Sequence, residues 1–166
     1  MNLPFESLSP ESRIWIYQSE RAFSAAEQES MSITIEQFLN TWSSHGSEMI
    51  SGFAFKHQRF IIISIDESLT DASGCSIDKL VHFMQNLGNN FQLNLIDRSI
   101  AYVENEEIKI CQFSQIKNLV GAGTINQDTP IFNTFITTKG ELATKWVVKA
   151  SETWTAKYFK PEASFA

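Results

Sequence analysis

The chain has 166 residues and a formal net charge of −6 at pH 7. Its 43% hydrophobic and 12% aromatic residues suffice for the core of one domain or two small ones, which excludes extensive disorder. The acidic balance argues against nucleic acid as a partner, because proteins that bind the phosphate backbone concentrate Lys and Arg.

Features that address a protein to a membrane or an export pathway are missing from the sequence. Residues 1–6 lack the basic stretch and apolar run of a signal peptide, and no apolar run reaches the roughly 18 residues of a membrane span. Cys75 and Cys111 are too few for a disulfide framework or a four-ligand zinc site, and they suit a reducing compartment. We therefore expect a cytoplasmic protein with free thiols, no membrane insertion, no metal and no cofactor.

The first half of the chain alternates between strand and helix patterns. Residues 13–19 are rich in β-branched and aromatic side chains and predict a strand. Apolar residues at helical spacing from Ser24 to Trp42 predict a helix that ends near residues 43–46, where Gly46 can cap it. The strand-like runs 49–55 and 60–65 are separated by a short polar turn and predict a hairpin.

A second helix and a further strand follow. The helix is predicted from apolar residues at helical spacing and ends near 88–90; these residues are Ile77, Leu80, Val81, Met84 and Leu87. The next strand covers 99–104. The order strand, helix, strand, strand, helix, strand predicts an α+β fold with the ferredoxin-like split βαβ arrangement (βαββαβ), an antiparallel sheet with both helices on one face.

The last third of the chain has shorter elements. Residues 108–112 are expected to pair with the preceding strand, 113–120 form a short helix, and 130–135 form a short strand. Residues 138–154 mix helix and strand signals and receive no assignment. Because no linker composition marks a boundary, we expect a ferredoxin-like part over 1–98 and a small α+β part over 99–166 in one compact unit.

The C-terminal part carries a pattern of short motifs. These are Ala101-Tyr102, Gln112-Phe113 before a short helix, Gly123-Thr124-Ile125, Asp128-Thr129-Pro130-Ile131-Phe132, and Trp146. The pattern resembles the small bacterial version of the GYF domain, a peptide-binding module, without the Gly-Pro step that normally precedes its helix. The resemblance implies a GYF-like fold with Tyr102, Phe132 and Trp146 as aromatic binding candidates. The alternative is that these three side chains belong to the core.

Two motifs in the N-terminal part point to a second family. They are PESRIWIYQ at 10–18 and ASGCSID at 72–78. They are similar to those of a family of small bacterial proteins of unknown function that is often labelled "ABC transporter ATPase". A nucleotidase of that class needs a glycine-rich loop with a Lys and a Ser or Thr, and no G-x-x-x-x-G-K-[ST] is present. We therefore reject ATP hydrolysis.

One group of reactive residue types lies at the predicted start of the second helix. Unpaired amides and the helix dipole at this end favour an anion, and so a thiolate at Cys75. Asp78 and His82 fall within about 60° of Cys75 around the helix and away from its apolar face. The neighbouring binding candidates are Ser73, Gly74 and Ser76.

Several functions fit this group. Cys, His and a carboxylate are the residues of thiol catalysis, but Cys75 and His82 lie about 10 Å apart along the helix axis. Alternatively Ser73 or Ser76 caps the helix while Asp78 and His82 form a surface pair. The group is also suited to contact a ligand or partner, or a metal if Asp66 or Asp71 joins Asp78 and His82.

The sequence favours a non-enzymatic cytosolic protein-interaction or regulatory module. Its expected partner is another protein or a second copy of the chain. The alternative function is a thiol-dependent enzyme or redox sensor centred on Cys75. A small-ligand sensor is a third possibility, which rests on fold analogy alone.

Overall fold

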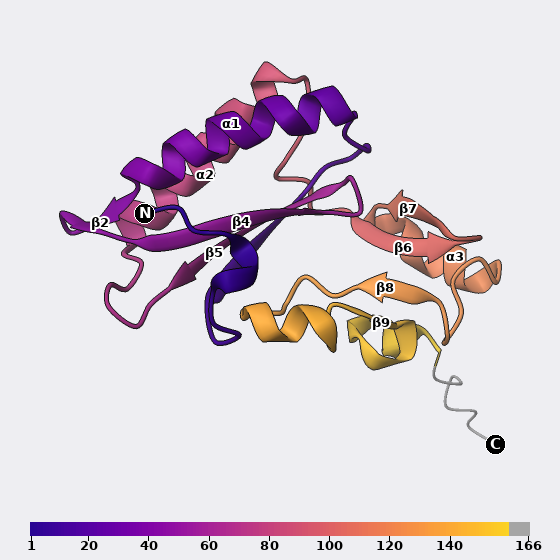
Figure 1. Ribbon diagram of the computed structural model, residues 1–166. Helices are drawn as coiled ribbons and strands as arrows, with labels where there is room; N and C mark the ends of the chain where they lie inside the picture. Colours follow the sequence, from indigo (N-terminus) through magenta and orange to yellow (C-terminus); the bar gives the residue numbers. More distant parts are fainter. Residues whose placement is uncertain (160–166) are drawn as a thin grey trace. The chain divides into compact units, whose positions relative to one another are not determined.

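The computed structural model describes residues 1–159, which form two compact units (Figure 1). The first unit contains Met1–Arg98 together with Thr137–Gly140, and the second contains Ser99–Ile136 and the chain from Glu141 onward. Helices and antiparallel sheets occur together, which confirms the predicted α+β class. The first unit thus combines the N-terminal 98 residues with the later segment Thr137–Gly140.

The first unit is built on a three-stranded antiparallel sheet in the order β1-β5-β4. Its strands are β1 (Arg13–Gln18), β4 (Ile50–Lys56) and β5 (Phe60–Asp66). The central strand β5 is buried along its first six residues, as expected for an isoleucine-rich strand that is covered on both faces. The predicted hairpin is confirmed, and its turn places His57 and Gln58 at positive φ.

Two helices cover one face of this sheet (Figure 1): α1 (Ala25–Thr41) and α2 (Gly74–Asn90). Both predicted helices are thus confirmed. Each begins with a capping box, formed by Ser24 with Glu27 and by Ser73 with Ser76. The core between helices and sheet consists of buried apolar side chains that include Met31, Ile35, Leu39, Ile61, Ile63, Ile65, Leu80, Met84 and Leu87.

The opposite face of the sheet carries a different set of side chains. Because side chains alternate along a strand, Ile14 and its cross-strand partner Ser64 point away from the helices. The N-terminal segment with the short helix η1 (Phe5–Ser7) lies against this face. A Cβ at Gly52 would lie 2.7 Å from the Leu3 carbonyl oxygen, so glycine permits this close approach.

The edge of β1 that faces away from β5 forms hydrogen bonds with the segment Thr137–Gly140. The Ile14 amide donates to the Thr137 carbonyl, and the Lys139 amide donates to the Ser12 carbonyl, both at 2.9 Å. The predicted fourth strand of the ferredoxin-like sheet, residues 99–104, therefore does not occupy this edge. It forms β6 (Ile100–Glu104) and pairs within the second unit, because two other strands there satisfy both of its edges.

The second unit contains a four-stranded antiparallel sheet in the order β7-β6-β8-β9. Its other strands are β7 (Glu107–Cys111), β8 (Pro130–Phe132) and β9 (Val147–Lys149). The predicted hairpin between 99–104 and 108–112 is confirmed, and the short helix after it is formed by η2 (Phe113–Gln115) and α3 (Ile116–Gly121). The core is formed by Ile100, Tyr102, Cys111, Ile116, Ile125, Ile131 and Ala150.

Short elements complete both units. The ribbon of β2 (Ser43–Ser44) and β3 (Ser47–Glu48) follows α1. The stretch 138–154, which the sequence left unassigned, contains η3 (Lys139–Ala143), β9 and η4 (Ala150–Glu152), and η5 (Trp154–Tyr158) follows. The mixed signals of this stretch thus correspond to an alternation of 3-10 turns with one short strand.

Candidate functional site

The serines near Cys75 form the cap of α2. The Ser76 amide donates to the Ser73 hydroxyl at 3.1 Å, and the Ser73 amide donates to the Ser76 hydroxyl at 2.8 Å. The Trp42 indole N–H donates to the Ser76 carbonyl at 2.9 Å, which ties the end of α1 to the start of α2. Ser73 and Ser76 therefore have structural partners, whereas Gly74 is exposed.

The side chains of Cys75, Asp78 and His82 are exposed on the outer surface of α2, on the side that the helical spacing predicts. Within residues 1–159, none of the three makes a side-chain hydrogen bond or an ion pair. No group of three or more His, Cys, Asp or Glu in this part of the chain can hold a metal ion. The structure thus places them on one face without assembling a base next to the thiol.

The aromatic candidates taken from the GYF-like pattern are buried. Tyr102 is 6%, Phe132 5% and Trp146 4% exposed. Burial raises the pKa of the Tyr102 hydroxyl, and Phe132 packs edge to face on Trp146 with ring centroids 5.2 Å apart. These positions agree with the core alternative for all three side chains.

A different set of aromatic side chains lies at the surface of the second unit. We call Phe113, Trp154 and Tyr158 the aromatic platform. The Phe113 ring is 58% exposed and stacks on Trp154, with centroids 5.2 Å apart and planes inclined by 25°. Tyr158 meets Trp154 edge to face at 6.2 Å. The Lys157 ammonium lies 5.7 Å from the Trp154 centroid and 5.2 Å from that of Tyr158.

Short hydrogen-bonded turns hold the platform in place. In η2, which carries Phe113, the Gln112 amide donates to the Gln115 side chain at 2.8 Å. In η5, which carries Trp154, the Thr155 amide donates to the Thr153 hydroxyl, and the Thr155 hydroxyl donates to the Ala150 carbonyl. Trp154 and Tyr158 also pack against the core of the unit. The rings are therefore preorganised on a supported surface.

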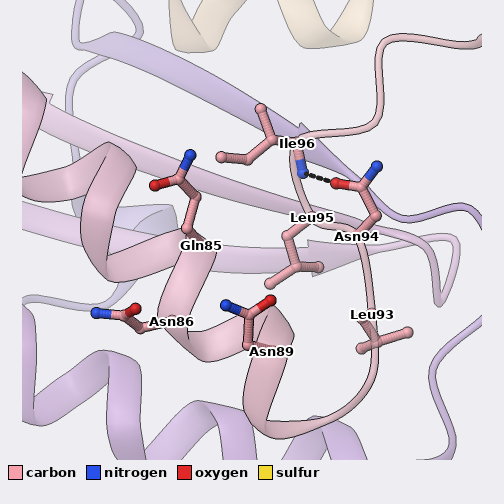
Figure 2. A pocket seen from close by; sticks show the side chains of 7 residues that line it. All are labelled: Gln85, Asn86, Asn89, Leu93, Asn94, Leu95 and Ile96. Carbon is pink, nitrogen blue, oxygen red and sulfur yellow. Dashed lines mark hydrogen bonds between the residues drawn. The ribbon is translucent and has the colours of Figure 1, made fainter.

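A pocket of about 380 Å³ lies in the first unit between the end of α2 and the segment after it (Figure 2). It is lined by Gln85, Asn86, Asn89, Leu93, Asn94, Leu95 and Ile96. The chain turns back here because Gly88 has no side chain: a Cβ would lie 2.5 Å from the Leu93 carbonyl oxygen. The pocket is lined by carboxamide and aliphatic side chains and by no charged group. It therefore suits a neutral ligand that forms hydrogen bonds.

No family model, curated protein or solved structure matches the chain. No helix within residues 1–159 has the length and apolar composition needed to cross a membrane.

Sequence reasoning did not identify the aromatic platform as a site. The sequence places Phe113 in the Gln112-Phe113 step of the GYF-like pattern, before a short helix, but not among the aromatic binding candidates, and it places Trp154 at the end of the unassigned stretch 138–154. Residue type does not distinguish an exposed aromatic ring from a buried one, because both strands and short helices bury Phe and Trp in most folds. Only the tertiary contacts show that Phe113 is exposed while Tyr102 is not.

Proposed function

We propose that this protein is a non-enzymatic interaction module that binds a short extended peptide on the aromatic platform. The observation that supports this function best is the stack of Phe113 on Trp154, in which the Phe113 ring stays 58% exposed. Large apolar side chains that are exposed in a group mark interaction surfaces more often than isolated ones do. Because the short turns already fix the rings, binding costs little ordering entropy.

The chemistry of the platform favours a peptide that contains proline. Aromatic-lined surfaces bind proline-rich segments in the polyproline II conformation, whose rings stack on flat aromatic faces. Lys157, next to Trp154 and Tyr158, adds a positive charge that favours an acidic residue in the peptide. The platform therefore suits an extended segment with proline and a nearby carboxylate.

The same proposal includes the finer fold assignments. We assign the second unit to a GYF-like arrangement, on the motifs around Phe113 and Pro130. We assign the first unit to a variant of the ferredoxin-like split βαβ, in which Thr137–Gly140 occupies the edge of β1. A cytoplasmic location also belongs to the proposal, and the free thiols of Cys75 and Cys111 support it.

The test is a titration with a panel of proline-containing peptides, with and without acidic residues, followed by tryptophan fluorescence and amide chemical shifts. Phe113→Ala removes the exposed ring of the stack, and we expect it to weaken binding about 30-fold, as for an aromatic hot spot. Phe135→Ala is the matched control, because Phe135 is a 74% exposed phenylalanine in the same unit. It should bind as the wild type does.

Two results would contradict the proposal. One is that no peptide in the panel gives a saturable change in the signals of Phe113, Trp154 or Lys157. The other is that Phe113→Ala and Phe135→Ala bind equally well, because the platform would then have no part in recognition.

A further inference from the structure

A second pocket, separate from the aromatic platform, lies beside the ends of β1 and β5 in the first unit. It has a volume of about 430 Å³. We call it the acidic pocket, and it is lined by Ser9, Glu11, Ser12, Asp66, Glu67 and Ser68. Every lining residue has a carboxylate or a hydroxyl side chain, so oxygen is the only polar side-chain atom in the pocket.

The three carboxylates of the acidic pocket, Glu11, Asp66 and Glu67, have no ion-pair partner among residues 1–159. Asp66 accepts the Ser68 amide at 2.9 Å, and Glu67 accepts the Ala72 amide at 3.0 Å, so backbone donors orient both groups. The negative charges of Asp66 and Glu67 are therefore oriented by backbone donors, without an ion pair to any described residue.

The cations closest in sequence or structure are engaged elsewhere. The Arg13 guanidinium lies over the Trp15 ring, 4.8 Å from its centroid, and thus on the helix-covered face of the sheet. The Lys139 ammonium donates to the Glu6 and Leu8 carbonyls at 3.1 and 2.5 Å. Neither side chain neutralises the acidic pocket.

An independent observation at the same place is the hydroxyl of Ser12. This residue is only 3% exposed, and within the described chain its Oγ has no hydrogen-bond partner. Arg13 pairs with Ile65 in the antiparallel register of β1 and β5, so the next pair outward is Ser12 with Asp66. The side chains of a directly opposed pair lie on the same face of the sheet, here the face opposite the helices. A buried hydroxyl without a partner is unfavourable, and a ligand in the pocket would provide one.

We propose that the acidic pocket binds an alkylammonium group. An ammonium carries three N–H donors and no acceptor, which complements carboxylates and a serine hydroxyl that accept hydrogen bonds. A metal ion fits less well, since the described residues contain no set of three or more side chains that can hold one. The same group occurs in free polyamines and in lysine side chains of other proteins.

The experiment titrates the full chain separately with spermidine and with a blocked Gly-Lys-Gly peptide, at about 100 mM salt to screen weak surface attraction. Amide chemical shifts of Ser12 and Ser68 report on the pocket. We expect saturable binding of at least one probe. Ser12→Ala and Glu11→Gln should each weaken it about tenfold, because each removes an acceptor for a charged donor.

Ser64→Ala is the matched control. Ser64 is also a fully buried serine on the same face of the sheet, and its hydroxyl has no hydrogen-bond partner within the described chain, but it does not line the acidic pocket. Its variant should bind as the wild type does. Binding of spermidine alone identifies a free polyamine as the ligand, and binding of the peptide alone identifies a lysine side chain. If both bind, the probe with the lower Kd identifies the source.

The proposal is overturned if neither probe gives a saturable shift. It is also overturned if Ser12→Ala, Glu11→Gln and Ser64→Ala all bind as the wild type does, because the attraction would then be a diffuse effect of the net negative charge. Glu11 has an exposed side chain, so Glu11→Gln keeps the fold and tests the charge independently of the buried hydroxyl.

Discussion

The two units contain similar groups of aromatic rings and use them differently. In the first unit Phe38 stacks on Phe83 at 4.1 Å and contacts Trp42 at 5.6 Å, and Trp42 is 2% exposed. In the second unit Phe113 stacks on Trp154 at 5.2 Å, yet Phe113 is 58% exposed. Trp42 is buried and Phe38 and Phe83 are half-buried, whereas the second group contains an exposed member in Phe113. Burial therefore separates an aromatic group that stabilises the fold from one that is suited to recognition.

Replacement of one tryptophan in each group should give the largest difference in the free energy of unfolding. Trp42→Ala should lower the free energy of unfolding by about 3–5 kcal/mol, because it opens a cavity in the core and removes the indole N–H that donates to the Ser76 carbonyl. Trp154→Ala should cost about 1 kcal/mol, since its ring is already partly in water. Urea denaturation followed by circular dichroism measures both. Equal losses would contradict the distinction between the two groups.

The features that sequence predicted best are those formed by neighbours along the chain. Apolar residues at helical spacing located α1 and α2, and a short polar turn between two β-branched runs located the β4–β5 hairpin. The cap of α2 was also anticipated, because Ser73 precedes the first helical residue. Each of these depends on contacts within about four residues or across one tight turn, which the local pattern determines.

The partner of a strand is not determined locally, and here the sequence prediction was wrong. The alternation of residues 99–104 identifies a strand but not the sheet it joins. β6 finds partners in β7 and β8, while Thr137 and Lys139 bond to the edge of β1. A choice between two edges depends on the whole tertiary arrangement, so an order of elements that fits a known topology is insufficient to assign it.

The candidate site illustrates the same limit. Helical spacing correctly placed Cys75, Asp78 and His82 on one exposed face of α2, but it does not report whether their side chains touch. The exposure of Phe113 and the unpartnered hydroxyl of Ser12 depend on side chains far away in sequence, and no local pattern marks either.

Acid should affect the stability of the two units differently, because it weakens a charged contact that lies in the first unit. The Arg21 guanidinium donates to both carboxylate oxygens of Glu27, at 2.9 and 2.8 Å, and the Ser24 amide donates to the same side chain. The Arg21 bonds, followed by the Ser24 amide, lower the pKa of Glu27 from 4.5 to about 2. Since the folded pKa lies below the unfolded one, the stabilisation is complete above pH 4.5 and is lost as the pH falls towards 2.

Urea denaturation of the wild type and Glu27→Gln at a series of pH values measures this contribution. The wild type should be the more stable protein at pH 7, and the difference should shrink steadily between pH 4.5 and 2. Glutamine retains an acceptor oxygen for the Ser24 amide, so the comparison isolates the charge. Parallel stability curves for the two proteins would show that the contact with Arg21 does not stabilise the fold.

The two thiols differ in the opposite sense from the aromatic groups: the exposed Cys75 lies in the first unit and the buried Cys111 in the second. Cys111 is 3% exposed, and burial raises the pKa of its thiol. Native protein treated with iodoacetamide at neutral pH should therefore be modified at Cys75 alone. Cys111 should react only after the second unit unfolds, and peptide mass spectrometry distinguishes the two positions.

The smallest expected effect is that of His82→Ala on this alkylation. Cys75 should react at about the rate of a cysteine in an unstructured peptide, because it is exposed, no described side chain forms a hydrogen bond or an ion pair with its sulfur, and His82 lies about 10 Å further along the helix axis. The variant should therefore label at the wild-type rate across the pH range. A thiol that reacts much faster than the peptide, and slows when His82 is removed, would require a second conformation in which the two side chains meet. That result would favour the thiol-dependent enzyme over the interaction module, since a binding surface has no use for an activated nucleophile.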